Sequence, residues 1–423
     1  MNLAYAYPWD IVGDPTAAER LAALGVDAVA LAASYHSTRA ATPYHPSHRI
    51  LDVPHSAFYL PVRPEAWGRL VPAAPTWTAP DAYLRARDAL LAAGLKVHAW
   101  TVLTHNSFLG QAHPDLVVRN AFGDPYPYAL CPSFEDVADY CERLVREVLT
   151  VGEPDGLILE GCGAMGFAHQ SVHEKTAGAD FDADLMSLCF CPGCADRYPE
   201  GTRDRVRAAI DGPPSGTGDA HATTRTGDAH ATTGTHDTHT TTGTHDIRAT
   251  TGTRGAHTPS GTRGTHTTSG PLETALGPLA DEVRTVRVEL SASLRLRLIT
   301  AARQLAPAVP ITLHANPAPW ATGPFAALPD GEQAADVLVG NCWGDPSTDA
   351  ARLARLGELC GPGQRVGAYV LALPPRHADA QALAELLRTY AKAGASEIHL
   401  YHAGLASPKR LAAMAEALRL AAL

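Results

Sequence analysis

Eight short apolar segments, each followed by a helical pattern or a long loop, constrain the fold of this 423-residue chain more than any other feature. Short apolar runs between turn residues are typical of buried strands, and their alternation with helices is typical of α/β proteins. The expected strands are Leu3–Tyr7, Asp27–Ala32, Lys96–Leu103, Gly156–Glu160, Ile311–His314, Ala335–Val339, Val366–Leu373 and Glu397–Tyr401. We therefore predict an α/β fold of the (β/α)8 TIM-barrel type. A doubly wound open sheet is the alternative, but no Gly-x-Gly-x-x-Gly motif follows the first strand.

Helical spacing of apolar residues follows most of these strands, and several of the helices end at a glycine, a common C-terminal stop. The expected helices are Pro15–Leu24, Pro80–Ala93, Phe134–Leu149, Leu272–Leu305 with a break near Pro278, Thr348–Leu359, Asp379–Ala393 and Pro408–Leu420.

A Thr/Gly/His-rich tract runs from about Gly212 to Gly270 and contains almost no apolar residues. Such a segment cannot bury enough surface to order itself, so we predict a disordered insertion between the fourth and fifth strands. The expected division is residues 1–211 for the first half of the barrel with its cysteine cluster, 212–270 for the insertion, and 271–423 for the second half.

The net charge of −10 argues against nucleic-acid binding, which needs a basic footprint. No apolar run approaches 18 residues, so no membrane span is expected. The segment Met1–Pro8 lacks the basic start and the apolar core of a signal peptide, which favours a cytoplasmic location. In that compartment the eight cysteines are expected to be thiols or metal ligands rather than disulfides.

Polar and aromatic residues gather where the expected strands end, which is where barrels of this type carry their active sites. The candidate substrate-binding residues are Asp10, His36, Trp100, His105, Asn106, His314, Asn316, Trp343 and Tyr401. Aromatic faces beside Asn, His and carboxylate groups suit sugar rings, which have apolar C–H faces and hydroxyl rims. The alternative is that these residues line the barrel mouth without a common task.

Glu160 is the first catalytic candidate because a charged residue that ends a buried strand needs a partner or a function. Its roles would be general acid/base or nucleophile, with a raised pKa near aromatic rings; a salt bridge is the alternative. Glycoside hydrolysis needs a second carboxylate, for which Asp345 is the candidate and Asp10 a weaker one. Because Asp345 precedes Pro346 and Ser347, it could equally cap a helix.

Cys189, Cys191 and Cys194 have the close spacing of a metal site, and a structural zinc needs a fourth ligand. Cys131 is the first candidate and Cys162 the second, while reduced surface thiols are the alternative interpretation. We predict that the four sulfurs of Cys131, Cys189, Cys191 and Cys194 converge about 2.3 Å from a structural zinc ion.

The order of these features resembles the β-galactosidases of glycoside hydrolase family 42. That family has a Cys-Pro before the helix that precedes strand four, an acid/base glutamate that ends strand four, and then a Cys-x-Cys-x-x-Cys. Cys131-Pro132, Glu160 and the segment Cys189–Cys194 match these three elements in order. Two departures stand out: Leu159 replaces the family's Asn, and the expected strand Val366–Leu373 lacks the family's nucleophilic glutamate.

The leading hypothesis is a glycoside hydrolase that acts on a small carbohydrate substrate, with no nucleic-acid or membrane partner and with homo-oligomerisation left open. A catalytically inactive carbohydrate-binding or structural barrel is the second hypothesis, and the missing strand-seven carboxylate favours it. A metal-dependent hydrolase using His36, His105, His169 or His173 ranks third, because the chain has no His-Glu-x-x-His motif.

Overall fold

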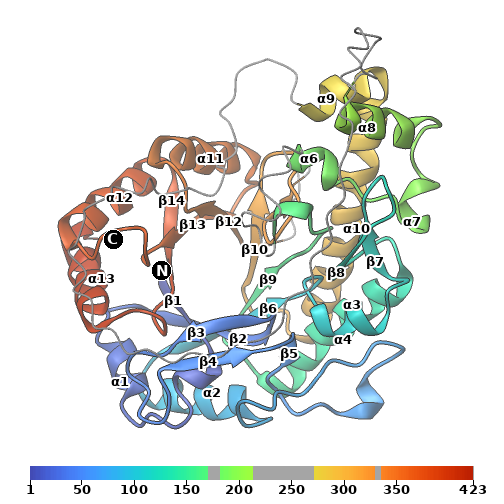
Figure 1. Cartoon of the computed structure of the whole chain (residues 1–423). Coiled ribbons are helices and arrows are strands. Elements are labelled where there is room, and N and C mark those ends of the chain that lie inside the picture. Colours follow the sequence, from blue (N-terminus) through green and yellow to red (C-terminus); the bar gives the residue numbers. More distant parts are fainter. Residues whose placement is uncertain (170–181, 213–270, 329–334, 423) are drawn as a thin grey trace, which may run out of the picture.

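The computed structural model describes residues 1–169, 182–212, 271–328 and 335–422. Apart from its first residue, Gly212, the predicted Thr/Gly/His-rich insertion lies outside the described residues, and so does His173. The described parts on either side of the insertion form the two halves of one barrel (Figure 1).

Eight parallel strands form a closed barrel, because each strand pairs with the next and the last pairs with the first. In order around the barrel they are β1 (Asn2–Ala6), β2 (Ala28–Tyr35), β6 (Lys96–Val102), β9 (Gly156–Glu160), β10 (Ile311–Asn316), β12 (Val337–Cys342), β13 (Arg365–Leu371) and β14 (Ala395–Tyr401). All eight predicted strands are present, with ends that differ by a few residues. The predicted TIM barrel is therefore confirmed, and the open sheet is excluded.

Helices surround the barrel and cover the outer faces of its strands (Figure 1). The helices of this outer layer are α1 (Ala17–Ala22), α2 (Ala82–Ala92), α4 (Glu135–Gly152), α10 (Ala280–Leu305), α11 (Pro346–Leu359), α12 (Ala380–Lys392) and α13 (Pro408–Ala421). The predicted break near Pro278 is confirmed, because α9 (Pro271–Leu276) and α10 are separated by a 3-10 turn, Gly277–Leu279. Among the described helices, none combines the length and apolar character needed to cross a membrane.

Several elements in the loops were not anticipated from the sequence, because their strands have only two to six residues. The loops after β2 and β6 contain β3 (Thr38–Ala41), β4 (Ile50–Val53), β5 (Ala57–Phe58), α3 (Ser107–Ala112), β7 (Val117–Arg119) and β8 (Pro125–Leu130). The loops after β9 and β10 contain α6 (Ala183–Met186), α7 (Pro192–Ala195), α8 (Thr202–Asp211) and β11 (Ala326–Ala327). Short 3-10 turns lie at Pro8–Asp10, Pro64–Ala66 and Phe167–His169.

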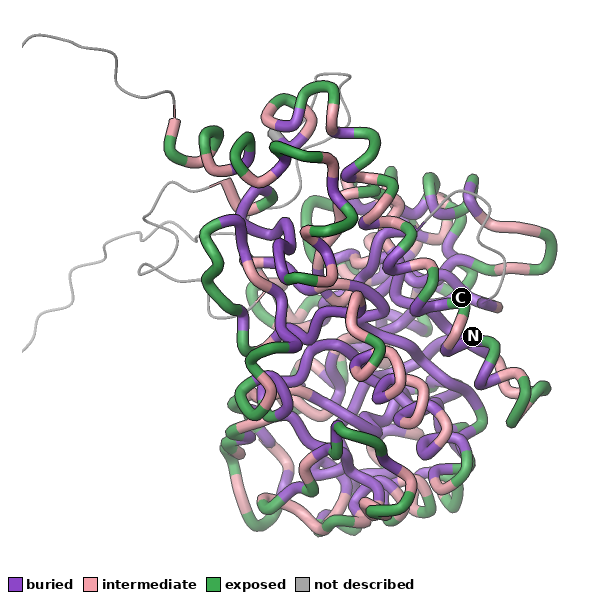
Figure 2. The backbone as a smooth tube through the Cα atoms, turned by 90° about the vertical axis from the view of Figure 1, so that its right-hand side faces the viewer, coloured by how far each residue is buried: buried purple, intermediate pink, exposed green. Residues whose placement is uncertain are grey.

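The buried apolar residues form two clusters. The larger one fills the barrel and the layer between strands and helices, where Figure 2 shows the backbone mostly buried. The smaller one joins β7 and β8 to the segments after β9 and to α9 and the N-terminal half of α10, with Val118, Leu188, Phe190 and Val283 among its members. This second cluster contains the four cysteines of the predicted metal site.

Candidate active site and metal centre

Glu160 ends β9 at the mouth of the barrel, and its side chain is buried. The Nε1–H of Trp100 on β6 donates a hydrogen bond of 2.6 Å to Glu160 Oε2. His314 Nδ1 on β10 lies 3.2 Å from the same oxygen. Burial raises the pKa of Glu160, but the contacts with His314 and Trp100 outweigh burial and hold the pKa below its ordinary value. The side chain is therefore an ionised carboxylate at neutral pH.

The expectation of a raised pKa for Glu160 was wrong. Burial raises the pKa, as predicted. His314 and the Trp100 N–H stabilise the charged carboxylate, however, and together they lower the pKa by more than burial raises it. An ionised carboxylate can attack an electrophilic carbon, stabilise positive charge or accept a proton. It cannot act as the initial proton donor.

Aromatic rings from β1, β6, β13 and β14, together with Trp343 just after β12, lie around Glu160 and form one wall of the mouth. Tyr5 packs edge-on against Trp100, with ring centroids 4.9 Å apart, and against Tyr369 at 4.8 Å. Trp343 stacks on Tyr369 at 5.5 Å and contacts Tyr401 at 4.8 Å. The Trp343 residue is 39% exposed, so this wall reaches the solvent and presents an aromatic face to it.

Three of the predicted mouth residues, Trp100, Trp343 and Tyr401, belong to this aromatic wall. Sequence reasoning missed Tyr5 and Tyr369, because each lies inside a strand that was interpreted only as apolar. The alternation of side chains along a strand could have identified Tyr5, because it lies two residues before Tyr7, which follows β1, and both rings contact Trp100.

His36 and His105 come together at the edge of the mouth with His169, which was weighed as a ligand. The rings of His36 and His105 are stacked with centroids 4.1 Å apart, and His105 Nδ1 lies 3.0 Å from His169 Nε2. Burial lowers the pKa of His169 to about 4, so this ring is neutral at neutral pH.

The two predicted asparagines have local structural partners. Asn106 caps α3, because its side-chain oxygen accepts a hydrogen bond from Leu109 N, and its amide donates to Tyr140 OH at 3.1 Å. Asn316 Oδ1 accepts a hydrogen bond from Ala318 N at 3.0 Å. These contacts stabilise the loops of the mouth, while a role in substrate binding stays a prediction.

Asp345 has the capping geometry that was one of its two expected roles. Its carboxylate accepts hydrogen bonds from the backbone of Ser347 and Thr348 at the start of α11, and the residue is exposed. Bonds with Ser347 and Thr348 lower its pKa, as expected for a carboxylate at a helix N-terminus. A catalytic role for Asp345 stays a prediction that a pair of variants can test.

We expect Asp345→Asn to keep most of the thermal stability and Asp345→Ala to lower the melting temperature, because Asn caps helices nearly as well as Asp whereas Ala cannot. Activity on a substrate separates the two roles, since neither Asn nor Ala supplies a carboxylate. Activity lost equally in both variants, with stability retained in Asp345→Asn, would assign Asp345 to the chemistry.

Asp10 lies in the loop after β1 and is nearly fully buried. Tyr7 N donates a hydrogen bond of 2.8 Å to Oδ2, while Oδ1 has no hydrogen-bond partner among the described residues. The carboxylate packs so closely against Gly404 that a Cβ there would lie 1.8 Å from Oδ2. Burial raises the pKa of Asp10 to about 7, against the lowering effect of the Tyr7 bond.

This raised pKa predicts that Asp10 makes stability depend on pH. An unfolded Asp ionises near pH 4 but folded Asp10 near pH 7, so the folded chain holds its proton longer and loses stability as pH rises between these values. We expect wild type to lose up to about 4 kcal/mol relative to Asp10→Asn over this range. Denaturant unfolding at several pH values measures the difference, and parallel pH profiles for the two proteins would contradict it.

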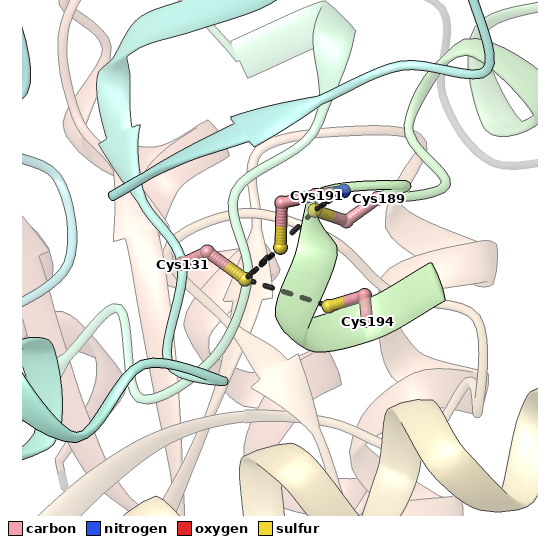
Figure 3. Close-up of side chains that lie close together, drawn as sticks. All are labelled: Cys131, Cys189, Cys191 and Cys194. Carbon is pink, nitrogen blue, oxygen red and sulfur yellow. Dashed lines mark hydrogen bonds between the residues drawn. The ribbon is translucent and has the colours of Figure 1, made fainter. Parts of the chain in front are cut away.

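The four cysteines predicted to bind metal converge on one point, as Figure 3 shows. Cys131 follows β8, whereas the other three lie in the segment that ends in α7. All four sulfurs lie within 4.8 Å of one another, and Cys131 Sγ is 3.5 Å from Cys194, 3.6 Å from Cys191 and 3.8 Å from Cys189. The predicted convergence is confirmed. Cys162, the alternative ligand, lies outside this group.

The geometry and chemistry of this cluster fit a tetrahedral metal ion. Four thiolate sulfurs around a zinc ion lie about 3.8 Å apart, close to the separations measured from Cys131. Hydrogen bonds from Cys131 and Cys189 lower the pKa of Cys191 and Cys194, so these thiols ionise readily. At Gly193 a Cβ would lie 2.6 Å from Ser133 Oγ, so glycine lets α7 approach the turn after Cys131. Among the described residues this cluster is the only group of three or more converging metal ligands.

No protein-family model and no curated protein matches the sequence. Solved structures do match. The α-L-fucosidase isoenzyme 2 of Paenibacillus thiaminolyticus is 11% identical and aligns over 99% of this chain and 49% of its own, with a TM-score of 0.50. A β-galactosidase of Halorubrum lacusprofundi is 11% identical. The alignment covers 100% of this chain and 58% of that protein, with a TM-score of 0.49. A GH42 β-galactosidase of G. stearothermophilus is 10% identical. The alignment covers 99% of this chain and 56% of that protein, with a TM-score of 0.49.

The chain therefore has a barrel fold like that of glycoside hydrolases, which confirms the predicted resemblance at the level of fold. It spans about half the length of the solved structures that it matches. At such low identity the likeness concerns the fold alone.

Proposed function

We propose that this chain is a glycoside-hydrolase-like enzyme that acts on a small glycoside, with Glu160 as its reactive carboxylate. The proposal rests on the position of Glu160 in the barrel and on the ionisation of its carboxylate. Glu160 ends a barrel strand at the mouth, it is ionised, and aromatic rings surround it. A carboxylate of this kind suits the oxocarbenium-like transition state of glycoside cleavage, in which positive charge develops on the sugar.

The lowered pKa of Glu160 favours a role as nucleophile or as charge stabiliser over a role as proton donor. Its Oε2 already accepts the Trp100 hydrogen bond and faces His314, so Oε1 is the oxygen left to approach the anomeric carbon. The exposed face of Trp343 and the neighbouring Tyr401 would stack on the sugar ring. His36 and His105 would border the neighbouring subsite.

The cysteine cluster would hold a structural zinc ion. Four buried sulfurs at tetrahedral separations leave no open position for a substrate, which is the arrangement of a structural site. The ion would link the turn after β8 to the segment around α7, on one side of the mouth.

A carbohydrate-binding barrel without catalysis is the second candidate, and two specific observations favour it. The polar side chains in contact with Glu160, among the described residues, are Trp100 and His314, neither of which is a carboxylate. In addition, β13 ends at Leu371 without an acidic residue. A barrel whose described residues place no second carboxylate against Glu160 could bind a sugar and leave it intact.

A panel of nitrophenyl glycosides tests the proposal with the purified full-length protein. Release of nitrophenol from one glycoside, abolished by Glu160→Gln, would support the enzyme. Calorimetric binding of the free sugars without any release would instead support the carbohydrate-binding barrel. The proposal also includes a small carbohydrate as the substrate and a cytoplasmic location for the protein. Whether the chain forms a homo-oligomer is open to measurement.

A further inference from the structure

A cavity of about 410 Å³ lies in the outer layer of the barrel, between the first turns of α12 and α13. These two helices are neighbours in that layer (Figure 1), and the loop that follows β13 also lines the cavity. Small side chains leave the space open, because four lining residues are alanines: Ala372, Ala378, Ala382 and Ala413. The volume is in the range of small-molecule sites, about 300–1,000 Å³.

Part of the lining is apolar. Leu383 and Leu386 on α12 are only half-buried, although both pack against the main core. Met414 on α13 is buried and also lines the cavity. Apolar surface that water can reach inside a concave site favours the binding of an apolar group.

Two arginines supply the charged part of the lining. Arg376, in the loop after β13, donates a hydrogen bond of 3.0 Å from Nη2 to Gly344 O, and Arg410 on α13 donates one of 3.2 Å from Nη1 to Ala372 O. Among the described residues each guanidinium has this one acceptor, a backbone carbonyl without net charge. Neither positive charge is therefore neutralised, and the exposed His377 beside them can only add to it.

Another cavity, between α4 and α10, shows the opposite arrangement. Arg146 and Arg297 line it, and they form salt bridges of 2.8 Å and 2.7 Å with Glu142. The cavity between α12 and α13 has one acidic lining residue, Glu385, which is exposed and accepts a hydrogen bond from Gln381 instead of from an arginine. Two guanidinium groups against one carboxylate make this lining positive in a chain whose net charge is −10.

We propose that this cavity is a second ligand site, which binds a small carboxylate with an apolar tail. The carboxylate would bind the guanidinium groups of Arg376 and Arg410, because a guanidinium fork matches the two oxygens of a carboxylate. The tail would cover Leu383 and Leu386 and exclude water from them. The site does not contain Glu160, so the inference goes beyond the proposed glycoside chemistry and does not depend on it.

The two kinds of lining argue against simpler ligands. Inorganic phosphate would use the arginines and leave the leucine side chains in contact with water. An uncharged alcohol would cover the leucines but would displace water from the guanidinium groups without offering a negative charge in return.

Isothermal titration calorimetry with octanoate tests the site on the full-length protein. We expect one octanoate to bind per chain, and both acetate and octanol to bind at least about tenfold more weakly, because each lacks one of the two interactions. Arg376→Met and Arg410→Met keep an apolar stem but remove the charge, so each should weaken octanoate binding by about tenfold. Arg419→Met is the matched control, because Arg419 is an exposed residue of α13 outside the cavity, paired with Glu416.

Ala413→Leu tests the cavity itself, since the larger side chain fills the apolar part and leaves both arginines in place. It should abolish octanoate binding, and it decides alone if an arginine variant does not fold. Absence of octanoate binding, equal affinity for octanol or inorganic phosphate, or an affinity unchanged in any folded one of these three variants would overturn the proposal. Because no glycoside is used, these results leave the test of Glu160 untouched.

Discussion

Glu160→Gln is expected to lower the turnover of a cleaved glycoside by a factor of about 100 or more, with little change in folding. The amide preserves the size of the side chain and can still accept the Trp100 hydrogen bond. It removes the negative charge that would attack the anomeric carbon or stabilise the developing charge. Steady-state kinetics measures the loss, and Glu416→Gln, on the exposed face of α13, is the control.

A second readout does not depend on turnover. A sugar analogue with a protonated ring nitrogen resembles the charge of the transition state, so it should bind more weakly to Glu160→Gln than to wild type. Neutral sugars should bind both proteins equally. Equal affinity for the charged analogue, together with full activity of the variant, would remove Glu160 from the mechanism.

The fold was predictable because its determinants are local. Gly156–Glu160 is an apolar run after a Pro-Asp-Gly turn, and it forms β9 with those same bounds. The same reasoning missed β3 and β4, because Thr38–Ala41 and Ile50–Val53 are short and only partly buried. The formation of such a hairpin depends on hydrogen bonding between its two strands, which an apolar sequence pattern does not reveal.

The candidate site was predictable in part, and the unpredicted part depends on contacts between distant residues. A charged residue at the end of a buried strand identified Glu160. The direction of its pKa shift depends on Trp100, which is 60 residues away, and on His314. The bond between Tyr5 and His314 spans 309 residues. No local pattern contains such pairs, so these contacts could be recognised only in the folded chain.

The cysteine site combines both kinds of information. The spacing of Cys189, Cys191 and Cys194 identified three ligands, while Cys131 was the first of two candidates for the fourth and also matches the Cys-Pro of the family resemblance. The convergence of all four sulfurs shows that the order of motifs carried three-dimensional information. The sulfurs lie within the second core cluster, so metal binding and packing of that region are coupled.

Removal of the proposed zinc is expected to unfold this second cluster while the barrel persists. Cys191→Ser should bind less than one equivalent of zinc and lose on the order of 4 kcal/mol of stability, since a hydroxyl ligates zinc poorly and the remaining buried thiolates lose their counter-charge. Cys360→Ser is the matched control, because Cys360 is a half-buried thiol outside the cluster. Its zinc content should equal that of wild type.

Elemental analysis and limited proteolysis together decide this prediction. Treatment of wild-type protein with a chelator should reproduce the Cys191→Ser phenotype, with new cleavage in the segments around α7 and α8. Cleavage should not extend to the barrel strands, which belong to the larger core. Wild-type protein that carries no stoichiometric metal, or that melts at the same temperature with and without chelator, would show that the four thiols pack without an ion. In that case the proximity of Cys131 to the other three would reflect packing within the second cluster alone.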